Sequence, residues 1–148
     1  MCMIFPSPCR AVSRDLKLFC ADLRLGSFER RHAMGVGIDR LAQFARDIAP
    51  QFLRSDVLAQ LLRVRIYADK AGAVPLDREA AEYEASLIRQ FQSHDSEAHL
   101  KGGFWFGRKG DKILTYMNPV STAFCYQALD MLSRHQSGDR HFLWQDLI

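Results

Sequence analysis

The chain has 148 residues, of which 48% are apolar and 25% are charged. This composition is typical of one globular domain with its own core, and it excludes a disordered or collagen-like chain. The net charge of +3 comes from 20 basic and 17 acidic scattered residues, which gives no basic stripe for nucleic acid, and no stretch reaches the roughly 20 apolar residues of a membrane span.

The first third of the chain predicts an irregular start and two helices. Residues 1–12 contain two prolines and are expected to be irregular. Residues 13–25 place apolar side chains at i, i+3, i+4 and i+7, which predicts an amphipathic helix. Residues 27–35 are polar and predict a connection. From about Gly37 a second apolar face predicts a helix, which the proline at position 50 stops.

The middle of the chain predicts two further helices joined by a short break. Ser55 suits the N-cap of a third helix, whose apolar residues keep a helical spacing until about Lys70. Residues 71–76 contain glycine and proline and predict the break. Asp77 is the expected N-cap of a fourth helix, whose buried stripe extends to Phe91. Connections this short force neighbouring helices into antiparallel hairpins.

The last third predicts a β-prone stretch and a final helix. Residues 104–117 place aromatic and β-prone residues around a glycine-containing turn, so a small β-hairpin or an ordered loop is expected. Asn118 before Pro119 predicts a helix start, because Asn caps free amides and Pro needs no donor there. This helix should end near His135, and residues 136–148 are apolar enough to dock on the body as a tail.

Together these elements predict a single all-α domain over residues 1–148, in which residues 13–135 form antiparallel helical hairpins. The four cysteines have no paired spacing, which favours reduced thiols and a cytoplasmic protein over a disulfide framework. Cys125 lies within an apolar helical pattern and is expected to fill the core. The first residues lack a basic start and a long apolar run, so no secretory signal is expected. The five histidines lack the spacing of a helix-borne metal site, so no metal or cofactor is expected.

The stretch GGFWFGRKGDKILTYMNPVSTAFCYQALDML, residues 102–132, resembles a recurring unit of the α/α toroid proteins. In that unit a Gly-Gly-aromatic loop leads into an inner helix with a Thr-Ala-hydrophobic and later an Ala-Leu pattern. Terpene cyclases, prenyltransferase catalytic subunits and many polysaccharide lyases, epimerases and glycosidases resemble one another in this way. The resemblance implies that the loop and the helix start lie at one mouth of a barrel, where such folds hold their ligand.

Carried over position by position, the resemblance implies a ligand site made of Trp105, Arg108, Asp111, Tyr116 and Asn118. An aromatic ring with a few polar groups suits a sugar or another large neutral or anionic ligand. The alternative is that the two aromatic residues cover helix ends while the two charged residues are solvated. The chain lacks the aspartate-rich motif of the cyclases and a histidine for the zinc set of the prenyltransferases, so neither chemistry is transferred.

A complete toroid of six or seven hairpins needs around twice this length. The chain is therefore expected to be the C-terminal portion of a longer toroid, a truncated gene product, or an open array that completes its core by association.

Two functions remain open. The first is a piece of a carbohydrate-active or cyclase-like enzyme, with Glu82, Glu84, Asp111 or Tyr116 as acid or base. The alternative is a non-catalytic helical interaction module, which forms a homo-oligomer or binds a protein partner. The sequence has no phosphate-binding glycine loop, no Gly-x-Ser-x-Gly elbow and no His-Glu-x-x-His pair.

Overall fold

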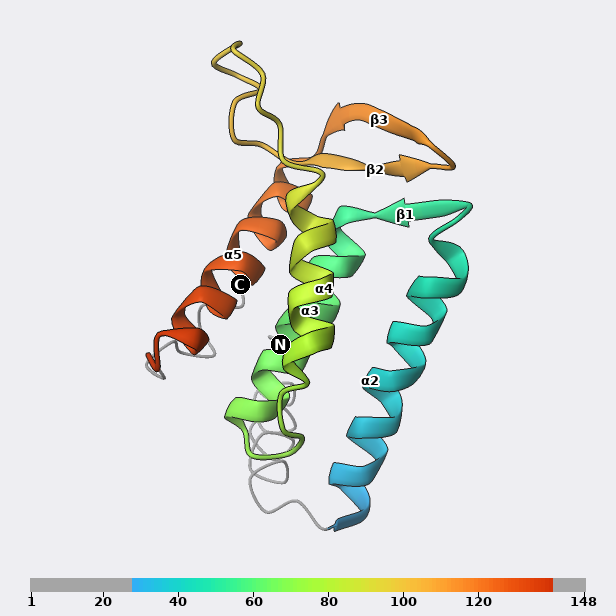
Figure 1. The fold of residues 1–148 in the computed structure, drawn as a ribbon, viewed down its shortest axis with the longest axis vertical. Helices are drawn as coiled ribbons and strands as arrows, with labels where there is room; N and C mark the ends of the chain where they lie inside the picture. Colours follow the sequence, from blue (N-terminus) through green and yellow to red (C-terminus); the bar gives the residue numbers. More distant parts are fainter. Residues whose placement is uncertain (1–27, 140–148) are drawn as a thin grey trace, which may run out of the picture.

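The computed structural model describes residues 28–139, which form helices beside a small antiparallel sheet (Figure 1). The central helix is α3 (Ser55–Lys70), and each of the other described helices packs on it or beside it. The remaining elements are helices α2 (Phe28–Ile48), α4 (Arg78–Arg89) and α5 (Pro119–Gln136) and strands β1 (Phe52–Arg54), β2 (Trp105–Lys109) and β3 (Lys112–Met117). The sheet lies across one end of the helices, where α2 ends and α3 and α5 begin (Figure 1).

The predicted all-α array of helical hairpins is wrong, because three strands form an antiparallel sheet in the order β1-β2-β3. The hairpin of β2 and β3 is the small hairpin that the sequence allowed. Strand β1 was missed because three residues are too short to show the alternation of a strand. It joins α2 to α3 and pairs with residues 107–109 of β2, so the fold mixes helices with a sheet.

Glycine is required where β1 and β2 meet. A Cβ atom at Gly107 would fall against the carbonyl oxygen of Leu53 and the backbone of Arg54. Only a residue without a side chain allows the two strands to approach this closely. In the β2–β3 turn, Gly110 has a φ of 55°, a conformation that glycine adopts without strain.

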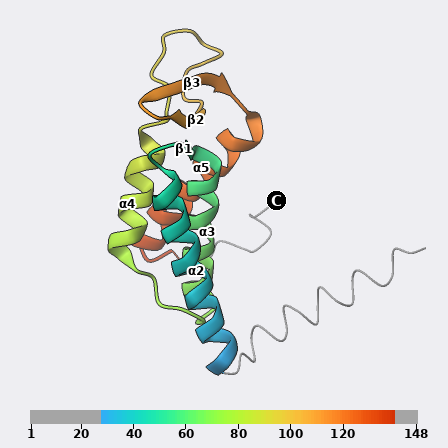
Figure 2. The same ribbon diagram turned by 90° about the vertical axis from the view of Figure 1, so that its right-hand side faces the viewer.

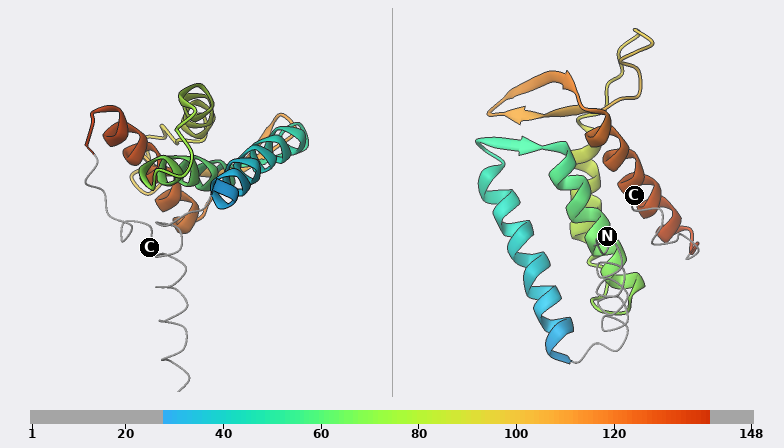
Figure 3. Two further views of the ribbon diagram at one scale, coloured as in Figure 1. Left: turned by 90° about the horizontal axis from the view of Figure 1, so that it is seen from below. Right: turned by 180° about the vertical axis from the view of Figure 1, so that it is seen from behind.

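The core has two parts of unequal size. The larger part joins apolar residues of α3, α4 and α5 with Leu53, Phe91 and Phe104. The smaller part attaches α2 to α3 through Ile38, Ala42, Leu61 and Ala68. Within its 21 residues, α2 buries only Ile38 and Ala42, and it lies at one edge of the molecule, on the side of α3 away from α5 (Figures 2 and 3).

Several predicted helix ends are confirmed. Helix α3 spans Ser55–Lys70 as expected, and the predicted N-caps Asp77 and Asn118 accept hydrogen bonds from backbone amides two or three residues ahead. Helix α5 ends at Gln136, one residue beyond the expected end. Cys125 is completely buried, as expected of a core residue. The predicted irregular segment 1–12, the predicted helix over residues 13–25 and residues 140–148 of the predicted C-terminal tail lie outside the described residues.

Two local predictions are wrong. Helix α2 begins at Phe28 rather than near Gly37, because the polar residues before Gly37 form the exposed side of a helix and not a connection. Ser55 does not cap α3. The N-cap is Arg54, whose side chain makes no capping hydrogen bond, and the buried Ser55 hydroxyl lies 2.8 Å from the carbonyl oxygen of Trp105, to which it donates. That serine therefore ties α3 to the sheet.

No helix in residues 28–139 combines the length and the apolar character needed to cross a membrane.

Candidate functional site

Two of the predicted ligand residues, Trp105 and Asn118, make contacts that stabilise the fold. Trp105 is partly buried and packs against the larger core. The side-chain oxygen of Asn118 accepts a hydrogen bond of 2.9 Å from the amide of Val120 and so caps α5. Trp105 therefore contributes to the packing of the core, and Asn118 stabilises the start of α5.

The other three predicted residues lie on the β2–β3 hairpin without forming one site. Asp111 is exposed in the turn. Tyr116 is about half exposed and stacks on Phe106, with ring centroids 4.9 Å apart. Arg108 is partly buried, and its Nε atom is buried with no hydrogen-bond partner among the described residues. No hydrogen bond, ion pair or ring contact between described residues joins any two of the five predicted residues.

A different cluster forms on the sheet, around Phe106. The guanidinium carbon of Arg54 lies 4.8 Å from the centroid of the Phe106 ring, and Phe52 and Tyr116 are the neighbouring rings. Two hydrogen bonds, of 3.0 Å and 2.6 Å, fix the Arg54 guanidinium to the Asp56 carboxylate and raise the pKa of the arginine. Phe52, Arg54 and Phe106 were not among the residues predicted for a site, although the Arg-Ser-Asp sequence at positions 54–56 is a signal for the ion pair.

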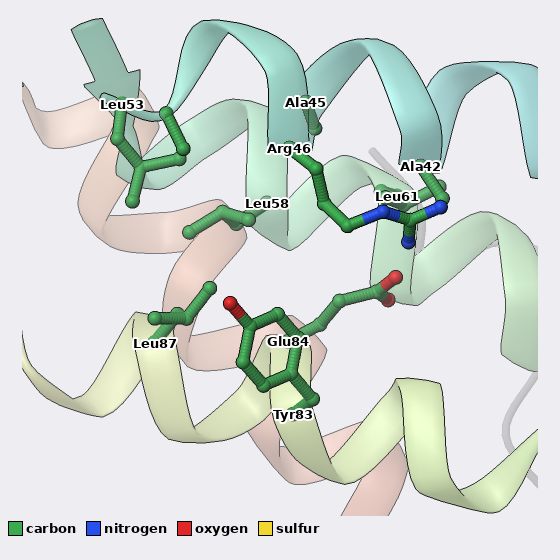
Figure 4. A pocket seen from close by; sticks show the side chains of 10 residues that line it. Ala42, Ala45, Arg46, Leu53, Leu58, Leu61, Tyr83, Glu84 and Leu87 are labelled. Atoms are coloured by element: carbon green, nitrogen blue, oxygen red, sulfur yellow. The ribbon is translucent and has the colours of Figure 1, made fainter. Parts of the chain in front are cut away.

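A groove runs between α2 and α4 over α3 (Figure 4). Its lining is mainly apolar and comes from Ala42, Ala45 and Arg46 of α2, Ala49 just after it, Leu53 of β1, Leu58 and Leu61 of α3, and Tyr83, Glu84 and Leu87 of α4. The free volume is about 30 Å³, which holds a water molecule or two, whereas sites for small-molecule ligands have roughly 300–1,000 Å³. The groove is therefore too small for a substrate.

Glu84 is the buried titratable group of this groove. It is 4% exposed, and its Oε1 atom accepts a hydrogen bond of 2.8 Å from Nε of Arg65. Its Oε2 atom is buried without a hydrogen-bond partner among residues 28–139, and Figure 4 shows the carboxyl group directed toward Arg46 on α2. Burial raises the pKa of the Glu84 carboxyl, although Arg65 acts in the opposite direction.

The proposed acid and base candidates are not paired in space. Glu82 is exposed on α4 and accepts a hydrogen bond from Gln136. Glu84 is buried in the groove, and Asp111 and Tyr116 lie on the hairpin. Within residues 28–139 no hydrogen bond, ion pair or ring contact joins any two of these four side chains. Within residues 28–139 no three His, Cys, Asp or Glu side chains gather as metal ligands.

The most distinctive surface is on α2, which carries two apolar stripes. The inner stripe, Ile38, Ala42, Ala45 and Ala49, faces the core or the groove. The second, which we name the outer stripe, consists of Gly37, Leu41, Phe44 and Ile48. Both stripes follow the spacing i, i+4, i+7, i+11, which keeps four side chains on one side of a helix.

Among the described residues, none covers the centre of the outer stripe. Leu41 is 56% exposed and Phe44 is 62% exposed. At 3.6 residues per turn, these two side chains lie roughly opposite Arg46, which lines the groove toward α4. The outer stripe therefore lies on the flank of α2 that faces away from α4. The sequence shows its spacing but could not show that its centre is exposed.

Comparisons with protein-family models, with curated proteins and with solved structures found no match to this chain. The resemblance of residues 102–132 to the α/α toroids stays a prediction, and the candidate site that the chain's own geometry supports best is the outer stripe of α2.

Proposed function

We propose that the protein is a helical interaction module, which binds an α-helix of a protein partner on the outer stripe of α2. The observation that carries this proposal is the exposure of Leu41 and Phe44 at the centre of a regular helical stripe. Fully burying a side chain of this kind contributes about 1.5–3 kcal/mol. Two such neighbours on a rigid helix therefore supply a favourable surface for association.

The spacing of the outer stripe favours a helix as the occupant. Steps of four, three and four residues are the pattern of a coiled-coil seam, in which apolar side chains of one helix insert between those of another. Helix α2 has 21 residues, so it offers a straight support of about 30 Å. An amphipathic helix with the same spacing would bury Leu41 and Phe44 together.

The shape of the described residues supports binding over catalysis. The groove beside Glu84 has about 30 Å³ of free volume, and within residues 28–139 the partner of the Glu84 carboxylate is Arg65 rather than a second carboxylate or a nucleophile. Cys125 is a buried free thiol whose pKa burial raises to about 12, so it suits a packing role rather than a nucleophile. Reduced thiols of this kind also support a cytoplasmic location for the module.

A photo-cross-linking residue at position 44 tests the proposal in cells that express the protein. We expect a specific cross-linked product from position 44. The matched control is position 39, because Asp39 is exposed on the opposite side of the same helix. Equal products from both positions, or no product from position 44, would contradict the docking role of the outer stripe.

A second candidate function is sugar binding on the sheet, favoured by the Phe106–Tyr116 stack and the fixed Arg54 guanidinium beside it. Exposed aromatic rings pack against the apolar faces of sugar rings. The Arg54 guanidinium, held in place by Asp56, would donate hydrogen bonds to the hydroxyl or carboxylate groups of the sugar. A panel of oligosaccharides measured by calorimetry tests it. Binding that Tyr116→Ala removes would support this function, and no binding across neutral and acidic glycans would exclude it.

A further inference from the structure

We infer that the helix bound by the outer stripe is α2 of a second copy of this chain, in the antiparallel orientation. This inference rests on the proposed function and names its partner. It is carried by the self-complementarity of the outer stripe and of two charged residues beside it, Arg40 and Asp47. Each is exposed, and the two are seven residues apart.

The apolar side chains of the stripe complement one another in an antiparallel pair. When two such helices pair about a two-fold axis, Leu41 lies opposite Phe44 of the second copy, and Gly37 lies opposite Ile48 of the second copy. The two-fold axis makes the contact between Leu41 and Phe44 occur twice, so the exposed Leu41 and Phe44 of both copies become buried. In the second pair, glycine leaves room for isoleucine, since no atom lies within 4 Å of the position a Cβ would take at Gly37.

The charges select the orientation. Arg40 and Asp47 occupy the same position in successive heptads, on the outward edge of the stripe. In the antiparallel pair Arg40 faces Asp47 of the second copy, and the two-fold axis repeats this ion pair. In a parallel pair neither residue meets the opposite charge at the flanking position, because Arg40 faces Ala45 and the position that faces Asp47 lies beyond the end of α2. Complementary charges of this kind fix register and orientation.

Arg40 and Asp47 are available for these contacts. Within the described residues Arg40 forms no ion pair or side-chain hydrogen bond, and Asp47 accepts one hydrogen bond of 2.7 Å from Gln43, four residues earlier on the same helix. Its second carboxylate oxygen can therefore face a partner. An isologous contact of this kind closes after two copies and gives a dimer rather than a filament.

A charge exchange tests the inference on the full chain. Arg40→Asp and Asp47→Arg, each alone, place like charges at both ion pairs, so we expect sedimentation equilibrium to show at least about a tenfold weaker dimer for either variant. Mixing the two variants restores both opposite-charge pairs, and a dimer with one copy of each should form at near the wild-type affinity. Asp39→Arg, which makes a like charge change away from the stripe, should leave the dimer unchanged.

The outcomes separate the inference from the proposed function. A wild-type chain that stays monomeric, or a mixture of the two variants that stays monomeric, overturns the second copy as the partner. If the cross-linker at position 44 then captures a different protein, the docking role of the stripe stands and only the inference fails. A cross-link from position 44 to residues 1–27 of the same chain overturns both, because the chain would cover its own stripe.

Discussion

At the scale of single residues, Glu84 shows how burial alters an acid without making it catalytic. The residue is 4% exposed, one carboxylate oxygen accepts a hydrogen bond from Arg65, the other has no partner among the described residues, and burial raises the pKa of the carboxyl. The folded state therefore holds this proton more tightly than the unfolded state does. As pH rises above 4.5, the ordinary pKa, the unfolded state loses the proton first, so this group lowers the stability until pH passes its folded pKa.

We predict that Glu84→Gln removes this dependence, because the amide keeps the shape and does not titrate. The free energy of unfolding of the variant should therefore gain on that of the wild type as pH rises through the range in which the unfolded chain, but not the folded one, has lost this proton. Urea unfolding between about pH 4 and about pH 7 measures it. A difference that moves the other way would mean that the ion pair with Arg65 outweighs burial.

At the scale of elements, the features that the sequence predicted correctly are those that depend on residues close together in the chain. Asp77 and Asn118 were found because a side chain that caps a helix acts on amides two or three residues away. The bounds of α3 followed from its apolar spacing. Strand β1 and the function of Ser55 could not be found in this way, since both depend on β2, about 50 residues later in the chain.

Helix α2 should be the least stable of the described helices. It buries only Ile38 and Ala42, whereas α3 buries nine residues. Amide hydrogen exchange should therefore show opening of α2 at a lower free energy than that of α3. Ile38→Ala should widen this gap by about 2–4 kcal/mol, because it removes most of the small core that attaches α2. Leu41→Ala, on the exposed stripe, should change the stability of the monomer by about 0.5 kcal/mol or less. Equal protection of α2 and α3 would contradict the division of the core.

At the scale of the whole molecule, the sheet decides the architecture. Its first strand joins the end of α2 to the start of α3, and the carbonyl oxygen of Trp105 in β2 accepts a hydrogen bond from the Ser55 hydroxyl. The sequence predicted the helices and the hairpin separately, but the pairing of β1 with β2 is a long-range contact that leaves no periodic pattern. For the same reason the five residues predicted for a ligand site proved to be distributed over the hairpin and its flanks, with the aromatic cluster formed by other residues.

Gly107→Ala tests whether this long-range contact holds the domain together. The added methyl group would meet the backbone of Leu53 and Arg54, which cannot yield as a flexible side chain can, so the free energy of unfolding should fall by about 1–3 kcal/mol. Gly35→Ala is the matched control, because a Cβ there has ordinary contact at 3.8 Å with Val74 and lies within a helix. That variant should gain about 0.5–1 kcal/mol. If both variants were equally stable in thermal unfolding, the close approach of β1 to β2 would not limit stability. The sheet would then contribute little to holding the helices together.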